Sequence, residues 1–75
     1  VKRAPEDPDF FEFRGEVYLK AGELQNALSD YNKLIQLSPK YRTGYKQRAV
    51  VYEKLDGKKS ARVLADLAMV KKLGG

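Results

Sequence analysis

The chain has 75 residues, 43% of them apolar and 33% charged, with a net charge of +5 and neither cysteine nor histidine. This length and balance indicate one small folded domain rather than a disordered segment, and the missing thiols and imidazoles exclude disulfides, zinc sites that need Cys or His, and catalysis by either side chain. Since every apolar run is short and the first residues lack an apolar stretch, we expect neither membrane insertion nor a secretory leader.

The first two helices are delimited by prolines and by an N-cap signal. Asp7 can accept hydrogen bonds from the first N–H groups of a helix over about 8–21, and Pro8 suits its first position. In the next segment, apolar residues recur every three or four positions, which predicts a helix over about 24–37. Pro39 then blocks its continuation.

Two further helices are predicted in the second half. Aligned apolar residues indicate a helix over about 42–55, and the Asp56-Gly57 turn separates it from another over about 59–73. Gly74 is placed to cap the last helix. Short connections imply antiparallel neighbours, so the expected fold is all-α and is built from four helices in antiparallel hairpins.

The two halves of the chain match at a shift of 34 residues. Identical or similar residues recur at this spacing in the pairs Phe11 and Tyr45, Arg14 and Arg48, Gly15 and Ala49, Val17 and Val51, Tyr18 and Tyr52, and Lys20 and Lys54. The same shift places Pro5 on Pro39 and Val1 on Ile35, which indicates that residues 1–7 are an entry segment whose first residues, Val1 to Ala4, are the tail of a helix from a preceding repeat. A fixed period of this size is the signature of stacked helical hairpins.

Three groups of residues carry a family resemblance, namely Phe11-x-x-Arg14-Gly15-x-x-Tyr18, Ala27-x-x-x-Tyr31 and Pro39. They resemble the tetratricopeptide repeat (TPR), whose pattern is a large aromatic, Leu-Gly and Tyr in one helix, then Ala, an aromatic and Pro. The resemblance implies a short α-solenoid with repeats over 8–41 and 42–75. It also implies small residues where helices approach closely, at Gly15, Ala27, Ala49 and Ala61.

Arginines depart from that pattern. Arg14 and Arg48 stand where the family usually has Leu. Because the stem of an arginine can lie along apolar neighbours, we expect both stems to pack in this way with the guanidinium groups outside.

The register of the last helix has two alternatives. Ala61 and Ala65 align with the first repeat without a gap, whereas Val63 and Leu67 align if the preceding turn carries two extra residues. The second register also places Asp66 on Asp30, and we favour it.

The resemblance implies an interaction module that binds a peptide or a partner helix in a concave groove lined by the first helix of each hairpin. The groove candidates are Glu12, Phe13, Glu16, Lys20, Lys46, Gln47, Val50 and Lys54. An ordinary solvated helix face is the alternative interpretation of these residues. The groove would be acidic on the first repeat and basic on the second, which suits a peptide of mixed charge.

The best-known binding mode of the family is a clamp of Lys, Asn and Arg that holds the C-terminal carboxylate of chaperone tails. In this chain Glu12 and Glu16 occupy positions where such a clamp needs Lys and Asn, and both would repel a carboxylate. We therefore expect no receptor for chaperone tails here.

The last helix is apolar on more than one side, and such a helix needs partners on two faces. We expect it to pack against a following helix, a preceding repeat or a second copy of the chain. The candidates for this packing are Val63, Leu64, Leu67, Met69 and Val70. A structural spacer or a self-associating fragment of a longer array is thus the alternative to a peptide-binding module.

Other functional classes are less favoured. Residues 40–75 carry ten Lys or Arg and three Asp or Glu, a net charge of +7, but helical periodicity scatters this charge and argues against nucleic-acid binding, even with Tyr41 available to stack on bases. Glu12 and Glu16 are one turn apart, yet nothing near them supplies a nucleophile or further metal ligands, so we expect no enzyme, cofactor or metal. The composition fits a soluble compartment and favours the cytoplasm.

Overall fold

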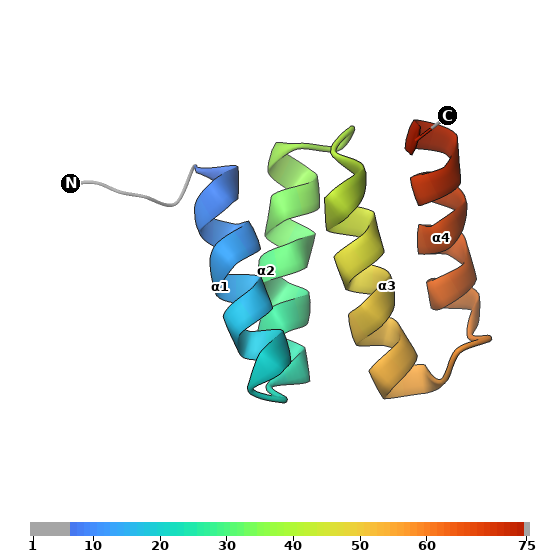
Figure 1. Cartoon of the computed structure of the whole chain (residues 1–75), viewed down its shortest axis with the longest axis horizontal. Coiled ribbons are helices and arrows are strands. Elements are labelled where there is room, and N and C mark those ends of the chain that lie inside the picture. The colour runs from blue at the N-terminus through green and yellow to red at the C-terminus, as the bar shows by residue number, and fades with distance from the viewer. Residues whose placement is uncertain (1–6, 75) are drawn as a thin grey trace.

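The computed structural model describes residues 7–74, and this part of the chain forms four α-helices with no strand (Figure 1). The helices are α1 (Pro8–Lys20), α2 (Leu24–Leu37), α3 (Arg42–Asp56) and α4 (Ala61–Gly74). The expected all-α fold is confirmed. The interpretation of residues 1–7 as an entry segment that includes the tail of a preceding repeat falls, apart from Asp7, outside the described residues.

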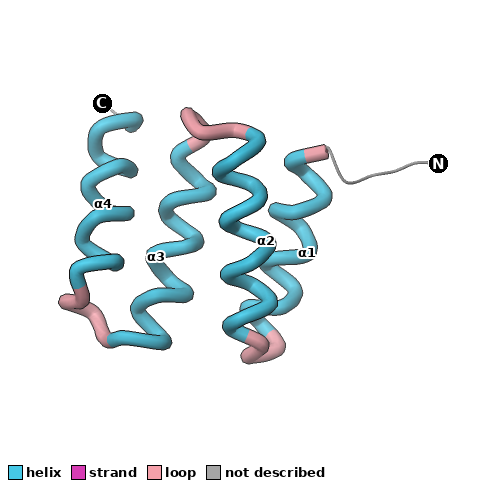
Figure 2. Tube along the Cα trace, turned by 180° about the vertical axis from the view of Figure 1, so that it is seen from behind, coloured by secondary structure: helices cyan, strands magenta, loops and turns pink. Residues whose placement is uncertain are grey.

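The helices stand side by side in chain order, and each runs antiparallel to the one before it (Figures 1 and 2). α1 packs on α2 and α3 packs on α4, which gives two hairpins, and contacts between α2 and α3 stack one hairpin on the other. This is the architecture of a short α-solenoid, with α1 and α4 at its two ends. None of the four helices has the length and apolar character needed to cross a membrane.

Local signals explain both ends of α1. The Asp7 side chain caps the helix by accepting the backbone N–H of Asp9 at 3.0 Å, and Pro8 occupies the first turn, as expected. The helix ends in a Schellman motif, in which the N–H of Glu23 donates to the carbonyl of Tyr18 at 2.9 Å. Gly22 supplies the left-handed residue of this motif at φ +80°.

The turn between α3 and α4 sets the start of the last helix. Gly57, the residue after α3, has a φ of +97°, a backbone conformation that residues with an L side chain rarely adopt. Ser60 then caps α4, since its Oγ accepts the backbone N–H of Val63 at 3.2 Å. The helix therefore begins at Ala61 rather than at about residue 59, and it continues through Gly74, which is its last helical residue and not a cap beyond it.

Burial decides the register of α4. Val63 and Asp66 are buried, whereas Ala61 and Ala65 are exposed. The register with two extra residues in the turn is therefore confirmed. The expected close-packing role of Ala61 is wrong, because Val63 takes the corresponding position on the buried face.

The core lies between α1, α2 and α3, and its buried cluster consists of Phe11, Ala27, Tyr31, Leu34 and Val51. Gly15 allows α1 to approach α2 closely, since a Cβ atom there would lie 2.8 Å from the ring of Tyr31. Any larger residue at this position would push the two helices apart. The tyrosine ring thus fills the space that the glycine leaves, and this fixes the spacing of the first hairpin.

Candidate protein-interaction surface

Each hairpin is held by an arginine that pairs with a buried aspartate. In the first hairpin, Arg14 Nε and Nη2 donate to the carboxylate oxygens of Asp30, both at 2.8 Å. In the second, Arg48 makes the same pair of hydrogen bonds to Asp66 at 2.9 and 2.7 Å. Both aspartates are at most 3% exposed. These hydrogen bonds raise the pKa of each arginine above its usual range, although desolvation acts in the opposite direction.

The expectation that the guanidinium groups lie outside holds for Arg14, whose side chain is 45% exposed, but is wrong for Arg48, whose side chain is 21% exposed. In both cases the guanidinium pairs with a buried aspartate, which was not expected. Burial of an aspartate requires a charged, bidentate partner, and the arginine supplies it. The arginines also stack on aromatic rings, with the Cζ of Arg14 4.9 Å from the ring centroid of Phe10 and that of Arg48 5.6 Å from Tyr52.

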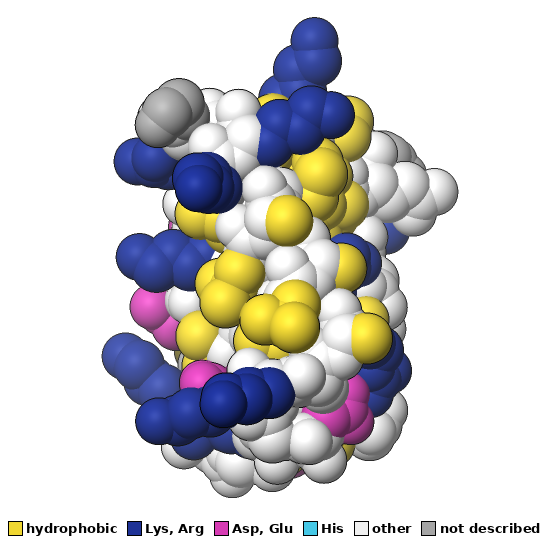
Figure 3. All heavy atoms as spheres, turned by 90° about the vertical axis from the view of Figure 1, so that its right-hand side faces the viewer, with side chains coloured by type: hydrophobic (Ala, Val, Ile, Leu, Met, Phe, Trp, Pro, Cys, Tyr) yellow, Lys and Arg dark blue, Asp and Glu magenta, His cyan; other side chains and the backbone are white. Residues whose placement is uncertain are grey.

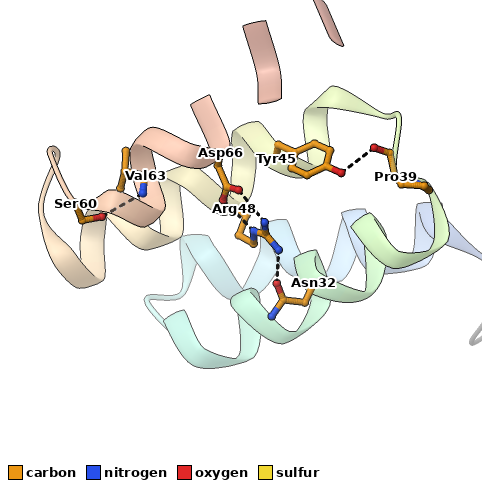
Figure 4. A network of polar contacts seen from close by, with 7 residues as sticks. All are labelled: Asn32, Pro39, Tyr45, Arg48, Ser60, Val63 and Asp66. Atoms are coloured by element: carbon orange, nitrogen blue, oxygen red, sulfur yellow. Dashed lines mark hydrogen bonds and ion pairs between the residues drawn. The ribbon is translucent and has the colours of Figure 1, made fainter. Parts of the chain in front are cut away.

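Arg48 additionally links the two hairpins. Its Nη1 donates to Oδ1 of Asn32 at 2.8 Å, so one side chain joins α3 to α4 and to α2 (Figure 4). Nearby, the hydroxyl of Tyr45 donates to the carbonyl of Pro39 at 2.8 Å and anchors the α2–α3 turn. These contacts fix the position of α3, and with it the surface residues that α3 carries.

The eight groove candidates lie on α1 and α3, and we call the face they form the α1–α3 surface. Phe13 is 69% exposed, and the charged side chains of Glu16, Lys20, Lys46 and Lys54 are exposed as well. The remaining candidates, Glu12, Gln47 and Val50, are partly buried. Since no enclosed pocket is found among residues 7–74, the α1–α3 surface is an open face.

A hydrogen bond joins α1 to the start of α3. The hydroxyl of Tyr41, the residue before α3, lies 3.1 and 3.0 Å from the two carboxylate oxygens of Glu12. The hydroxyl donates its single proton to one of them, which orients the carboxylate. Sequence reasoning missed this role of Tyr41 because the two residues are 29 positions apart and no local pattern connects them.

Beneath the α1–α3 surface lies the hydroxyl of Tyr31, which is buried and makes no well-formed hydrogen bond to the described residues, although the side chain of Gln47 interacts with it weakly. The pKa of Tyr31 is raised to about 12, first by burial and then by the carboxylates of Glu16 and Glu12. The side chain of Gln47 acts in the opposite direction and lowers this pKa. Candidates on both α1 and α3 therefore influence the ionisation of one hydroxyl on α2.

The face of α4 that points away from α3 is apolar at its centre. Figure 3 shows hydrophobic side chains gathered along this end of the molecule, with Lys and Arg side chains around them. Leu64 and Leu67 are exposed, and Met69 and Val70 are partly buried. Val63 differs from the other packing candidates, because it is 2% exposed and belongs to the interior of its own hairpin.

Two stacked antiparallel hairpins, with the same arginine–aspartate pair in each, define the chain as a helical-hairpin repeat protein. A sequence model described as TPR repeat matches residues 15–56, which is more than half of the chain, and the chain therefore belongs to the TPR family. Repeats of this family indicate a protein–protein interaction module.

One curated relative extends the match. Hsp70-Hsp90 organizing protein 2 of Arabidopsis thaliana is 35% identical over 51 residues, which cover 68% of this chain and 9% of that protein. The chain thus spans only a small part of the relative's length. No solved structure matches the chain.

Proposed function

We propose that the chain binds a protein segment of mixed charge along the α1–α3 surface. The electrostatics around Tyr31 support this proposal, because Glu12 and Glu16 of α1 and Gln47 of α3 all affect the pKa of one buried hydroxyl. The hydrogen bond from Tyr41 to Glu12 also ties the start of α3 to α1. This contact favours one continuous face over two independent ones.

The charges on this face favour a ligand whose basic, apolar and acidic residues follow a defined order along its chain. The α1 side offers the carboxylate of Glu16, and the α3 side offers the ammonium groups of Lys46 and Lys54, all exposed. The exposed ring of Phe13 adds an apolar contact. A segment with a basic residue over α1, an apolar residue over Phe13 and an acidic residue over α3 would match all three features.

A terminal carboxylate is a poor ligand for the same face. Glu12 and Glu16 both lie on the α1 side, and two like charges ~4 Å apart near a protein surface repel by about 1–4 kcal/mol. The matched relative is named as an organizing protein for Hsp70 and Hsp90. For this chain we propose recognition of an internal segment instead of a free chain end.

The test uses two synthetic peptides with the same composition and opposite charge order, one basic then acidic and the other acidic then basic, each with an amidated C-terminus. Fluorescence anisotropy with the wild-type chain should show a preference for one order of at least about tenfold, equivalent to about 1.4 kcal/mol. The Glu16→Lys/Lys54→Glu variant should reverse that preference. A control, Glu23→Lys/Lys58→Glu, makes the same two changes at exposed positions outside this face and should leave the preference unchanged.

Equal binding of both peptides by the wild-type chain would refute the proposal. Stronger binding of a peptide that ends in a free carboxylate than of its amidated form would also refute the part that excludes chain ends. In either case the chain would serve as a structural spacer or as a receptor of a different kind.

A further inference from the structure

The two ends of the helix row both expose apolar side chains. On α1, Val17 is 49% exposed and Phe10 is 37% exposed. On α4, Leu67 is 46% exposed and Leu64 is 54% exposed. α1 and α4 lie at opposite ends of the row, so these are two separate faces of one molecule (Figures 1 and 2).

The junction between α2 and α3 shows what such faces pack against. α3 corresponds to α1 at a shift of 34 residues, and the buried pair Asp30 and Asp66 relates α2 to α4 at a shift of 36. At these shifts, Val17 is the counterpart of Val51, and Leu67 is the counterpart of Tyr31. Val51 and Tyr31 are completely buried, whereas their counterparts are nearly half exposed.

The exposed faces are therefore the two halves of an α2–α3 type junction, one half at each end of the molecule. In the internal junction, Gly44 lies so close to Ile35 that a Cβ atom on it would be 2.9 Å from that side chain. At the two ends of the molecule, the corresponding positions carry side chains of different size. Phe10 takes the place of Gly44, and the flexible Lys71 takes the place of Ile35.

We propose that the chain associates head to tail, with α4 of one copy packed antiparallel on α1 of the next copy, as α2 packs on α3. Charge supports this pairing over others. Lys71 and Lys72 at the end of α4 would meet Asp7 and Asp9 at the start of α1. Arg62, at the other end of α4, is already paired with Asp56 at 2.8 Å.

Pairing of α4 with α4 of a second copy is disfavoured by the same charges. In an antiparallel pair, Lys71 and Lys72 of one copy would face the start of α4 of the other, where Asp56 is already paired with Arg62 and offers them no contact like that with Asp7 and Asp9. The favoured contact joins two different faces and leaves one of each unused, so it permits growth beyond a dimer into longer assemblies or rings.

This contact is weaker than the internal junction. There Arg48 donates to Asn32 at 2.8 Å, but the residue in the place of Asn32 on α4 is Ala68, which offers no side-chain acceptor to Arg14. Association should therefore be reversible and should depend on protein concentration. It should also weaken as salt concentration rises, because the lysine–aspartate contacts are exposed to solvent.

The test is sedimentation velocity on the whole chain over a hundredfold range of concentration, with the variants Leu67→Glu on α4 and Val17→Glu on α1. Both residues are exposed, so both variants should fold, and circular dichroism checks this. The weight-average mass of the wild-type chain should rise beyond that of a dimer, and each variant alone should stay monomeric. Gln25→Glu, an exposed change on α2, is the charge control and should behave as the wild type.

Mixing the two variants gives the decisive result. The Val17→Glu chain keeps its α4 face and the Leu67→Glu chain keeps its α1 face, so an equimolar mixture should form dimers with twice the monomer mass and nothing larger. A wild-type chain that stays monomeric throughout, a Val17→Glu chain that dimerises alone, or a mixture that stays monomeric would each overturn the proposal. The charge-reversal variants of the α1–α3 surface retain both end faces, so peptide binding and self-association can fail independently.

Discussion

The pair formed by Arg48 and Asp66 allows a quantitative test of how the second hairpin is held. Replacing Arg48 with Met keeps most of the apolar stem but removes the two hydrogen bonds to Asp66, at 2.9 and 2.7 Å, and the one to Asn32, at 2.8 Å. The Asp66 side chain is 4% exposed, so the variant retains a buried carboxylate without its partner.

The structure sets the size of the expected loss. Removing one partner of a buried ion pair typically costs 3–5 kcal/mol, and because the Arg48 side chain is 21% exposed, the lower end of about 3 kcal/mol applies. Asp66→Asn should cost less, about 1–2 kcal/mol, since the remaining guanidinium can turn towards water. A domain of this size has a free energy of unfolding of roughly 4–11 kcal/mol, so the Arg48→Met loss would be a large part of the total.

Urea unfolding followed by circular dichroism at 222 nm measures these differences. The double variant Arg48→Met/Asp66→Leu removes both charges and should be more stable than Arg48→Met alone, because no unpaired charge is left in the interior. A free energy of unfolding for Arg48→Met within 1 kcal/mol of wild type would refute the reasoning. So would a double variant no more stable than the single one.

Three further predictions concern other contacts. Tyr31→Phe removes a buried hydroxyl that makes no well-formed hydrogen bond, so at pH 7 it should keep or raise stability by up to about 1 kcal/mol in urea unfolding. Because the folded pKa of Tyr31 is about 12 and the unfolded value about 10, wild-type stability from this group is intact below pH 10 and falls as pH rises towards 12. The loss is about 1 kcal/mol at pH 11, and the Phe variant should not show it; parallel pH dependences of the two proteins would contradict this. Gly57→Ala forces a side chain into φ +97°, ψ 162° and should cost about 1–3 kcal/mol, whereas a melting temperature equal to wild type would argue against strain at this turn. Ser60→Ala removes the N-cap of α4 and should lower stability by about 1 kcal/mol in the same melts, with Ser60→Thr as the variant that retains the cap.

Local patterns made the helices and their ends predictable. The N-cap role of Asp7 and the turn at Gly22 depend on residues within one or two positions, and such signals can be recognised without knowledge of the fold. The repeat period then linked the two halves, and the family resemblance correctly placed Gly15 at a close helix contact. Each of these inferences used neighbours in sequence or a fixed spacing.

Contacts between distant side chains were not predictable in the same way. Arg14 and Asp30 are 16 positions apart and Arg48 and Asp66 are 18 apart, so neither pair stands out on one helix face. A signal was nevertheless present, because an arginine replaces an apolar residue in both repeats and an aspartate recurs in both second helices. Combining the two recurrences would have paired them.

The α1–α3 surface remains a prediction about function. Glu12 and Gln47 both affect the pKa of the same buried hydroxyl, but a solvated face and a binding face have similar exposure. Only the order of charge on a bound peptide distinguishes the two. The α4 face was easier to recognise, because its exposed leucines, at 46% and 54%, belong to a group of apolar side chains rather than being scattered singly (Figure 3).

The α3–α4 turn has a practical consequence for engineering. The second repeat spans two more residues between its arginine and its aspartate than the first, and both hairpins still form the same ion pair. The added length is taken up at one edge of the row, where α3 continues to Asp56, two residues beyond the counterpart of Lys20, and is followed by the exposed residues 57–59. This edge can therefore accept a fluorophore, an epitope tag or a short inserted loop while both helix ends and the opposite edge keep their geometry.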